Sequence, residues 1–165
     1  MQLRQQSTTY CRSSARRGVT SIELVITVMI IGIIAAVATP RFTQFYRTER
    51  LNAAGRRVAA DLNLARSWAA TTSSPQTVTF SLANHGYIVS GGLEDPQRPG
   101  KIFETRLNTE PYWSRIFSVN FDSLNVVSFN GAGLPSSGGT IVIGNKPQAI
   151  TIVVDPVTGK ATVNQ

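Results

Sequence analysis

Few side chains in this sequence are of the kinds that do chemistry. One histidine, His85, and one cysteine, Cys11, occur in 165 residues. His85 could act as a base toward Ser136 or Ser137, but these serines lie in a glycine-rich stretch that lacks the G-x-S-x-G pattern of a nucleophile turn. One cysteine and one histidine also give no zinc-binding set and no intrachain disulfide. We therefore expect no enzyme and no cofactor.

Two adjacent acids, Glu94 and Asp95, could offer oxygen ligands to Ca²⁺. They fall within residues 91–100, a polar stretch with two prolines that predicts a loop. Acids in such a loop are mostly exposed to solvent. Calcium binding by this pair stays an open question at this point.

The carboxylate in the least favourable surroundings is Glu23, which is the only charged residue between Arg17 and Arg41. A charge inside lipid costs about 2.5–3.5 kcal/mol on insertion scales, and by default it indicates a partner. The residues after it, 24–40, are uncharged, and a helix of about 20 residues spans a hydrocarbon core of about 30 Å. The sequence therefore predicts a transmembrane half-helix over 19–40, which Pro40 should bend.

The helical pattern continues beyond Pro40 with one apolar side. The residues at spacings of three and four are Leu51, Ala54, Val58, Leu62, Ala65 and Ala69. Arg50, Arg57, Asp61 and Asn63 lie largely off this stripe. We predict an amphipathic half-helix over 41–72 that packs on a domain and ends before Pro75.

Residues 73–165 change to the period of two that is typical of strands. We predict a hairpin around Asn84-His85-Gly86 and six further strands, at 102–106, 116–120, 126–129, 140–143, 150–154 and 161–163. The fold class is thus α+β, with a long N-terminal helix packed on a small antiparallel β-sandwich head. Basic residues concentrate before this head, since residues 67–165 hold six bases and six acids out of a net +7 for the chain.

Residues 1–18 contain four arginines and no acid, and they end in Arg16-Arg17-Gly18 ahead of Val19-Thr20-Ser21-Ile22-Glu23. This arrangement resembles the class III signal of type IV pilins and type II secretion pseudopilins. The resemblance implies that residues 1–18 are a cytoplasmic leader. A prepilin peptidase would cut after Gly18 and methylate the new N-terminus, Val19. Val19 and Ser21 depart from the residues that the family prefers there.

The same resemblance makes Glu23 the fifth mature residue and Pro40 the helix-bending proline. We expect the Glu23 carboxylate to pair with the α-amino group of Val19 on a neighbouring subunit. That contact would neutralise both charges and set the axial register of a filament. The expected partners are other pilin-type subunits, the prepilin peptidase, an inner-membrane assembly platform and membrane lipid.

Three other interpretations of the N-terminus stay open. Ala36-Val37-Ala38 matches the cleavage site of an ordinary secretory signal peptide, which would release a soluble β domain starting at Thr39. The apolar segment could also be a plain single-span anchor. Arg16-Arg17 could belong to a twin-arginine export signal.

The head shows a second resemblance, to the GspH/FimT-type minor pilin domain. Its landmarks are DLNLARSWA at 61–69, FNGAGLP at 129–135 and ITIVVDPVTGKATV at 150–163. This implies a minor subunit with its head in the periplasm, which serves either the type II secretion pseudopilus or a type IV pilus. Some FimT-like pilins bind DNA through arginines near the end of the head, but residues 158–163 offer only Lys160. Because phosphate binding needs several converging cations, we do not expect nucleic acid as a partner.

Overall fold

The computed structural model describes residues 18–164, apart from the side chains of residues 38–42. The chain divides into two compact units, Met1–Arg41 and Phe42–Gln165, which are considered separately. The helix α1 runs over Ser21–Thr72 and contributes to both units. The two predicted half-helices, 19–40 and 41–72, are thus parts of one continuous helix that begins two residues later than predicted.

The side chains of α1 from Ile22 to Val37, in the first unit, are all exposed. The exposed residues include Ile22, Leu24, Val25, Ile26, Val28, Met29, Ile30, Ile31, Ile33, Ile34 and Val37. No helix within the portion of the chain that was described is both long and apolar enough to cross a membrane.

The second unit contains eight strands after the helix. These are β1 (Gln76–Ser81), β2 (Gly86–Glu94), β3 (Ile102–Arg106), β4 (Arg115–Asn120), β5 (Val126–Phe129), β6 (Gly139–Asn145), β7 (Gln148–Val154) and β8 (Ala161–Asn164). They form two four-stranded antiparallel sheets, in the orders β3-β2-β1-β5 and β4-β6-β7-β8. The predicted α+β class with antiparallel sheets is confirmed.

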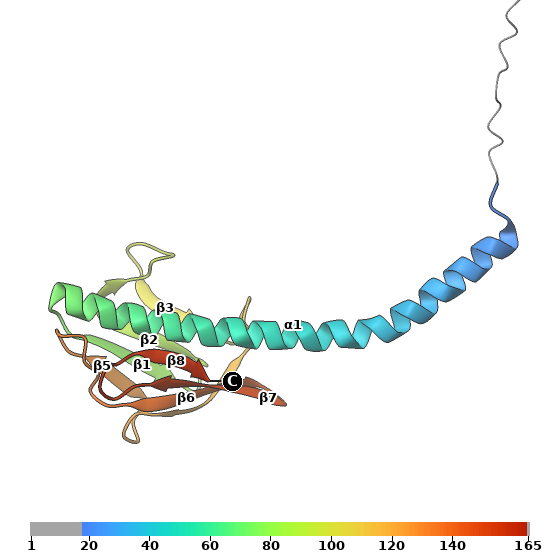
Figure 1. Ribbon diagram of the computed structural model, residues 1–165. Helices are drawn as coiled ribbons and strands as arrows, with labels where there is room; N and C mark the ends of the chain where they lie inside the picture. Colours follow the sequence, from blue (N-terminus) through green and yellow to red (C-terminus); the bar gives the residue numbers. More distant parts are fainter. Residues whose placement is uncertain (1–17, 165) are drawn as a thin grey trace, which may run out of the picture. The chain divides into compact units, whose positions relative to one another are not determined.

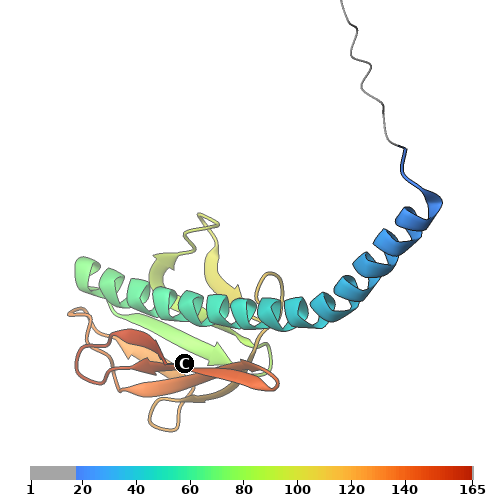
Figure 2. The same ribbon diagram turned by 45° about the vertical axis from the view of Figure 1, so that its right-hand side comes forward.

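The head part of α1 lies along both sheets (Figures 1 and 2). Asn63 bonds β8, because its amide donates to the Ala161 carbonyl at 3.0 Å and its oxygen accepts the Ala161 N–H at 3.1 Å. On another side of the helix, Asp61 accepts a hydrogen bond from Tyr87 of β2. The helix thus ties one sheet to the other.

A single core fills the space between the helix and the sheets. All six residues of the predicted stripe are buried, together with the alternate residues of the strands that face them, such as Val78, Phe80, Ile141 and Ile152. Gly55 lets the helix approach closely, because a Cβ there would meet the Ile150 side chain. Every core residue lies between Leu51 and Ala161, so the second unit holds its own core.

Candidate functional site

The predicted processing and assembly residues surround the start of α1. Gly18 and Val19 are exposed and precede the helix. The Thr20 hydroxyl accepts a hydrogen bond from the Glu23 N–H at 3.3 Å, and the Thr20 carbonyl accepts from the Leu24 N–H at 3.1 Å. Thr20 is therefore the N-cap, and Thr20-Ser21-Ile22-Glu23 has the spacing of a capping box.

Glu23 therefore occupies a position that suits a carboxylate for a local reason. Acidic residues in the first helical turn interact favourably with the helix dipole. Glu23 is exposed, as are its apolar neighbours Ile22 and Leu24. Its predicted pairing with another subunit stays a prediction. The same holds for the bend at Pro40, whose side chain lies outside the described residues.

A buried polar network joins α1 to the first sheet of the head. One Asp61 carboxylate oxygen accepts from the Tyr87 hydroxyl at 2.5 Å and from Arg57 Nε at 2.8 Å, and Thr105 Oγ1 lies at 3.5 Å. Asp61 is only 5% exposed. Desolvation raises its pKa, although the donors from Tyr87 and Arg57 oppose that effect. Burial, followed by the neighbouring carboxylate, raises the pKa of Tyr87 well above its ordinary value.

The prediction that Arg57, Asp61 and Asn63 lie off the packed face of the helix is wrong. Asp61 is buried, Arg57 is partly buried beside it, and Asn63 bonds to Ala161 of β8. Asp61 comes three residues after Val58 and four before Ala65, so its spacing places it against the sheet. The polarity of the side chain hid this from a count of apolar residues. Because Tyr87 and Arg57 both donate to it, burial is tolerated there.

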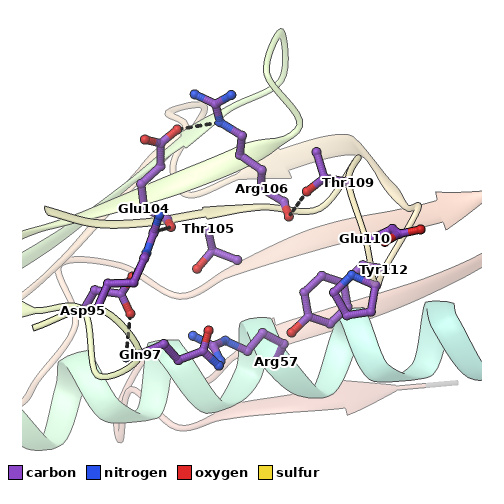
Figure 3. Close-up of a pocket in the computed structure, with 11 residues that line it drawn as sticks. Arg57, Asp95, Gln97, Glu104, Thr105, Arg106, Thr109, Glu110 and Tyr112 are labelled. Atoms are coloured by element: carbon purple, nitrogen blue, oxygen red, sulfur yellow. Dashed lines mark hydrogen bonds and ion pairs between the residues drawn. The ribbon is translucent and has the colours of Figure 1, made fainter. Parts of the chain in front are cut away.

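A polar cavity of about 480 Å³ lies beside this network (Figure 3). Its charged lining residues are Arg57, Arg98, Arg106, Asp95, Glu104 and Glu110. Arg98 Nε donates to Asp95 at 2.7 Å and Arg106 Nε donates to Glu104 at 2.8 Å. Three bases and three acids that largely pair with each other favour a structural role over anion or cation binding.

The two candidate calcium ligands have partners within the chain. Asp95 is buried, and it accepts from the Gln97 N–H and from Arg98, while Glu94 accepts from the Gly100 N–H. Desolvation alone would raise the pKa of Asp95, but the bonds from Gln97 and Arg98 outweigh it and lower that pKa. The loop prediction for residues 91–100 is wrong in part, because β2 extends to Glu94. No group of three or more potential metal ligands occurs among the described residues.

The serine and histidine weighed for catalysis lie at opposite ends of β1. His85 lies in the turn that follows β1, whereas Ser136 bonds to Ser128 of β5, which pairs with Thr77 near the start of β1. At about 3.4 Å per residue, the length of β1 separates them. They therefore form no nucleophile–base pair.

The three sequence landmarks of the head meet at one corner, which we call the landmark corner and define by Arg66, Gly133, Pro135, Thr158 and Gly159. Arg66 of the helix donates to the Thr158 carbonyl at 2.7 Å. A Cβ on Gly133 would lie 3.1 Å from the Arg66 carbonyl, and one on Gly159 would lie 3.0 Å from the Pro135 ring and 3.2 Å from the Gly133 carbonyl. Both glycines have positive φ angles, +75° and +67°.

A comparison with protein-family models identifies the family of this chain. Residues 54–159 match the model of a family described as type II transport protein GspH. The chain belongs to the GspH family. The matched range contains the first two landmarks completely and ends at Gly159, within the third. The contacts at the landmark corner give these residue types a structural role in this chain.

Solved structures show the same fold. The minor pilin FimU of Pseudomonas aeruginosa strain PAO1 aligns with a TM-score of 0.54 and 14% identity, covering 73% of this chain and 92% of that chain. The minor pseudopilin EpsH of the type 2 secretion system of Vibrio cholerae aligns with a TM-score of 0.53 and 12% identity, covering 70% and 96%. A comparison with curated proteins finds no match. As a GspH-family member with this fold, the chain is a minor pilin-type subunit.

Residues 158–163, the region that was compared with the DNA-binding arginines of some FimT-like pilins, mostly pack within the head. Gly159 and Ala161 are buried, and the Thr158 carbonyl is bonded to Arg66. Arg66 therefore packs on the head itself rather than pointing freely into solvent. Within residues 158–163, Lys160 supplies one exposed cation.

Proposed function

We propose that this chain is a minor pseudopilin that assembles into the pseudopilus of a type II secretion system through α1. A prepilin peptidase would cut after Gly18 and methylate Val19. Residues 19–40 would hold the protein in the bacterial inner membrane as a single pass, with the head in the periplasm. Its role would be structural rather than catalytic, and the inner-membrane assembly platform would load it into the filament.

The observation that supports this proposal best is the exposure of every described apolar side chain from Ile22 to Val37. An all-apolar surface of this kind is unfavourable in water and needs lipid or other apolar helices around it. Before assembly, lipid would cover these side chains. In the filament, the equivalent helices of neighbouring subunits would cover them.

Glu23 would set the axial register in which the helices of neighbouring subunits pack. In lipid its carboxylate is penalised, and the free α-amino group of Val19 on a neighbouring subunit would neutralise it. Its capping position at the start of α1 is compatible with that role, because the Thr20–Glu23 bond uses the backbone N–H of Glu23. The carboxylate itself stays exposed and available to a partner.

A type IV pilus is the second candidate, which is favoured by the likeness to the minor pilin FimU. The TM-scores to FimU and to the pseudopilin EpsH differ by 0.01, so the fold does not separate the two machines. Deleting the gene and measuring both secreted proteins and surface pili would separate them. Loss of secretion with normal pili supports the pseudopilin role, and the converse supports the pilin role.

The decisive experiment is the N-terminal sequence and mass of the protein isolated from membranes, with and without the prepilin peptidase. We expect a start at N-methylated Val19 that depends on the peptidase. A start at Thr39 would mean an ordinary signal peptide and would overturn the proposal. An uncut chain in both strains would indicate a plain membrane anchor. In a separate DNA-binding assay, a gel shift by the head that is lost at raised salt would favour a pilus that binds DNA.

A further inference from the structure

One end of the head carries an exposed group of aromatic and basic side chains, which we call the aromatic–basic rim. It consists of Phe45, Tyr46, Trp113 and Phe117 with the cations Arg47, Arg50, Arg115 and Lys146. All eight residues belong to the second unit. We propose that this rim binds the headgroup layer of an anionic lipid membrane while the subunit awaits assembly. The inference rests on the proposed membrane anchor and adds a second contact between the protein and lipid.

The aromatic members form one connected surface. Tyr46, Arg50 and Trp113 line one surface hollow, and Trp113, Phe117 and Lys146 line another. Trp113 therefore belongs to both hollows. The Phe45 and Tyr46 rings meet edge to face, with their centroids 6.3 Å apart.

Contacts within the head place this surface where the helix enters it. Thr48 Oγ1 of α1 donates to Gln148 Oε1 at 3.0 Å, which brings the turn between β6 and β7 beside the first residues of α1 in this unit. In Figures 1 and 2 the β6–β7 hairpin likewise ends beside that part of the helix. Lys146 lies in this turn, and the Asn145 side chain donates to the Trp113 carbonyl at 3.2 Å.

The position of the rim along the chain favours lipid as the occupant. Phe45 and Tyr46 follow Pro40, the end of the predicted membrane segment, by five and six residues, which is about 8–9 Å along a helix. The headgroup layer on each side of a bilayer is about 5–8 Å thick. Aromatic rings concentrate at this level, and basic side chains there are attracted to anionic lipids.

The charge of the rim is suited to the same partner. Two acids, Glu49 and Glu110, lie at the first hollow, so the four cations leave a net charge of +2. Aromatic and basic residues together also bind single-stranded nucleic acid. However, Phe45, Tyr46, Arg47 and Arg50 follow directly after an apolar segment, and residues 67–165 are neutral overall, with six bases against six acids.

The test uses the mature chain, from Val19, reconstituted into vesicles of equal parts phosphatidylcholine and phosphatidylglycerol. The chain has two tryptophans, Trp113 in the rim and Trp68 near the other end of the helix, and they are 49% and 40% exposed. Trp68→Phe leaves Trp113 as the only reporter, and Trp113→Phe leaves Trp68. We expect brominated lipid to quench Trp113 emission several-fold more strongly than Trp68 emission. Equal quenching of the two, or quenching of neither, would overturn the proposal.

A second measurement separates this inference from the membrane anchor. The second unit alone, residues 42–165, contains the helix segment and the β head with their whole core. It is tested by flotation with the same vesicles, so its result does not depend on integration of the apolar part of α1. Arg50→Gln and Lys146→Gln should each weaken binding about fivefold, whereas the control Lys160→Gln should not. Binding should also fall with salt.

Three results of this second measurement would overturn the proposal. The first is a folded head that does not float. The second is equal flotation with pure phosphatidylcholine. The third is a head that binds an oligonucleotide but not vesicles. Failure of the mature chain to integrate, with normal flotation of the head, would instead count against the proposed anchor and leave the rim supported.

Discussion

The Tyr87 hydroxyl donates a 2.5 Å hydrogen bond to the Asp61 carboxylate, and through it the second strand of the head is joined to the helix. Both residues are almost fully buried, at 1% and 5% exposed. A carboxylate in that position needs its donors, because each one that is removed leaves a desolvated charge less well compensated. The bond therefore contributes to holding the helix in place on the head.

Tyr87→Phe should lower the free energy of unfolding of the head by about 1.5–3 kcal/mol, since hydrogen bonds to charged groups are worth that much. Urea denaturation followed by circular dichroism measures the change. Tyr46→Phe is the matched control, because Tyr46 is exposed and should unfold like the wild type. If both variants matched the wild type, Asp61 would be adequately satisfied by Arg57 and Thr105 alone.

The tight contacts at the landmark corner predict that a side chain at Gly133 destabilises the head. Gly133→Ala should destabilise the head by more than the cost of a left-handed residue alone, which is about 1–2 kcal/mol. Gly100→Ala isolates that backbone cost, because Gly100 has nearly the same φ, +76°, and nothing within 4 Å of an added Cβ. Thermal unfolding of both variants gives the difference. If the two variants lost equal stability, the residues around Gly133 would have to make room for the added methyl group at no cost in free energy.

Two roles of the residues at the start of α1, capping the helix and setting the axial register of a filament, can be tested separately. Glu23→Gln keeps a residue that suits a capping box but removes the charge, whereas Thr20→Ala removes the cap and keeps the charge. If Glu23 pairs with a neighbouring α-amino group, Glu23→Gln should enter filaments several-fold less than the wild type and Thr20→Ala should enter normally. Filament incorporation is measured by immunoblotting sheared filaments against membranes. The reverse pattern would make Glu23 a helix cap and nothing more.

Asp155 should give the head an acid-sensitive turn between β7 and β8. Its carboxylate accepts from the Thr158 N–H and hydroxyl and from the Val157 N–H, and these bonds lower the pKa of Asp155. A lowered pKa in the folded state stabilises the fold above the ordinary value of 3.8, and this stabilisation is lost as the pH falls through the folded-state pKa. The stability difference between the wild type and Asp155→Ala should therefore shrink below pH 3.8. A difference that does not change with pH would show that charge plays no part in the turn.

Local patterns in the sequence sufficed to predict the elements of the head. The predicted strands at 102–106 and 126–129 coincide with β3 and β5. The predicted strands at 150–154 and 161–163 lie within β7 and β8. Glycine, proline and asparagine mark such boundaries locally, because each has its own backbone preferences. The order of the strands could not be derived in this way. Pairings such as Val78 with Val127 depend on residues far apart in the chain.

Only part of the candidate site could be predicted from the sequence, because some of its residues come together only in the folded chain. Gly18, Val19 and Glu23 could be picked out from the sequence, because a glycine and a single charge lie next to an apolar segment in the chain itself. Asp61 was missed because burial of a carboxylate depends on its donors, and Tyr87 and Thr105 come from two different strands. The aromatic–basic rim was missed because Tyr46 and Trp113 are 67 residues apart, and only the fold brings them to one surface hollow.

The pairing of Asn63 with Ala161 has a consequence for how the head is made. It joins the helix to the last strand, across 98 residues of chain. Contacts over such separations form late, because the intervening loop must be ordered first. A growing chain that emerges helix-first has no partner for Asn63 until β8 has left the ribosome. Formation of this part of the fold is therefore tied to synthesis of β8, and a truncated chain that ends before β8 would leave the Asn63 side of the helix without its partner.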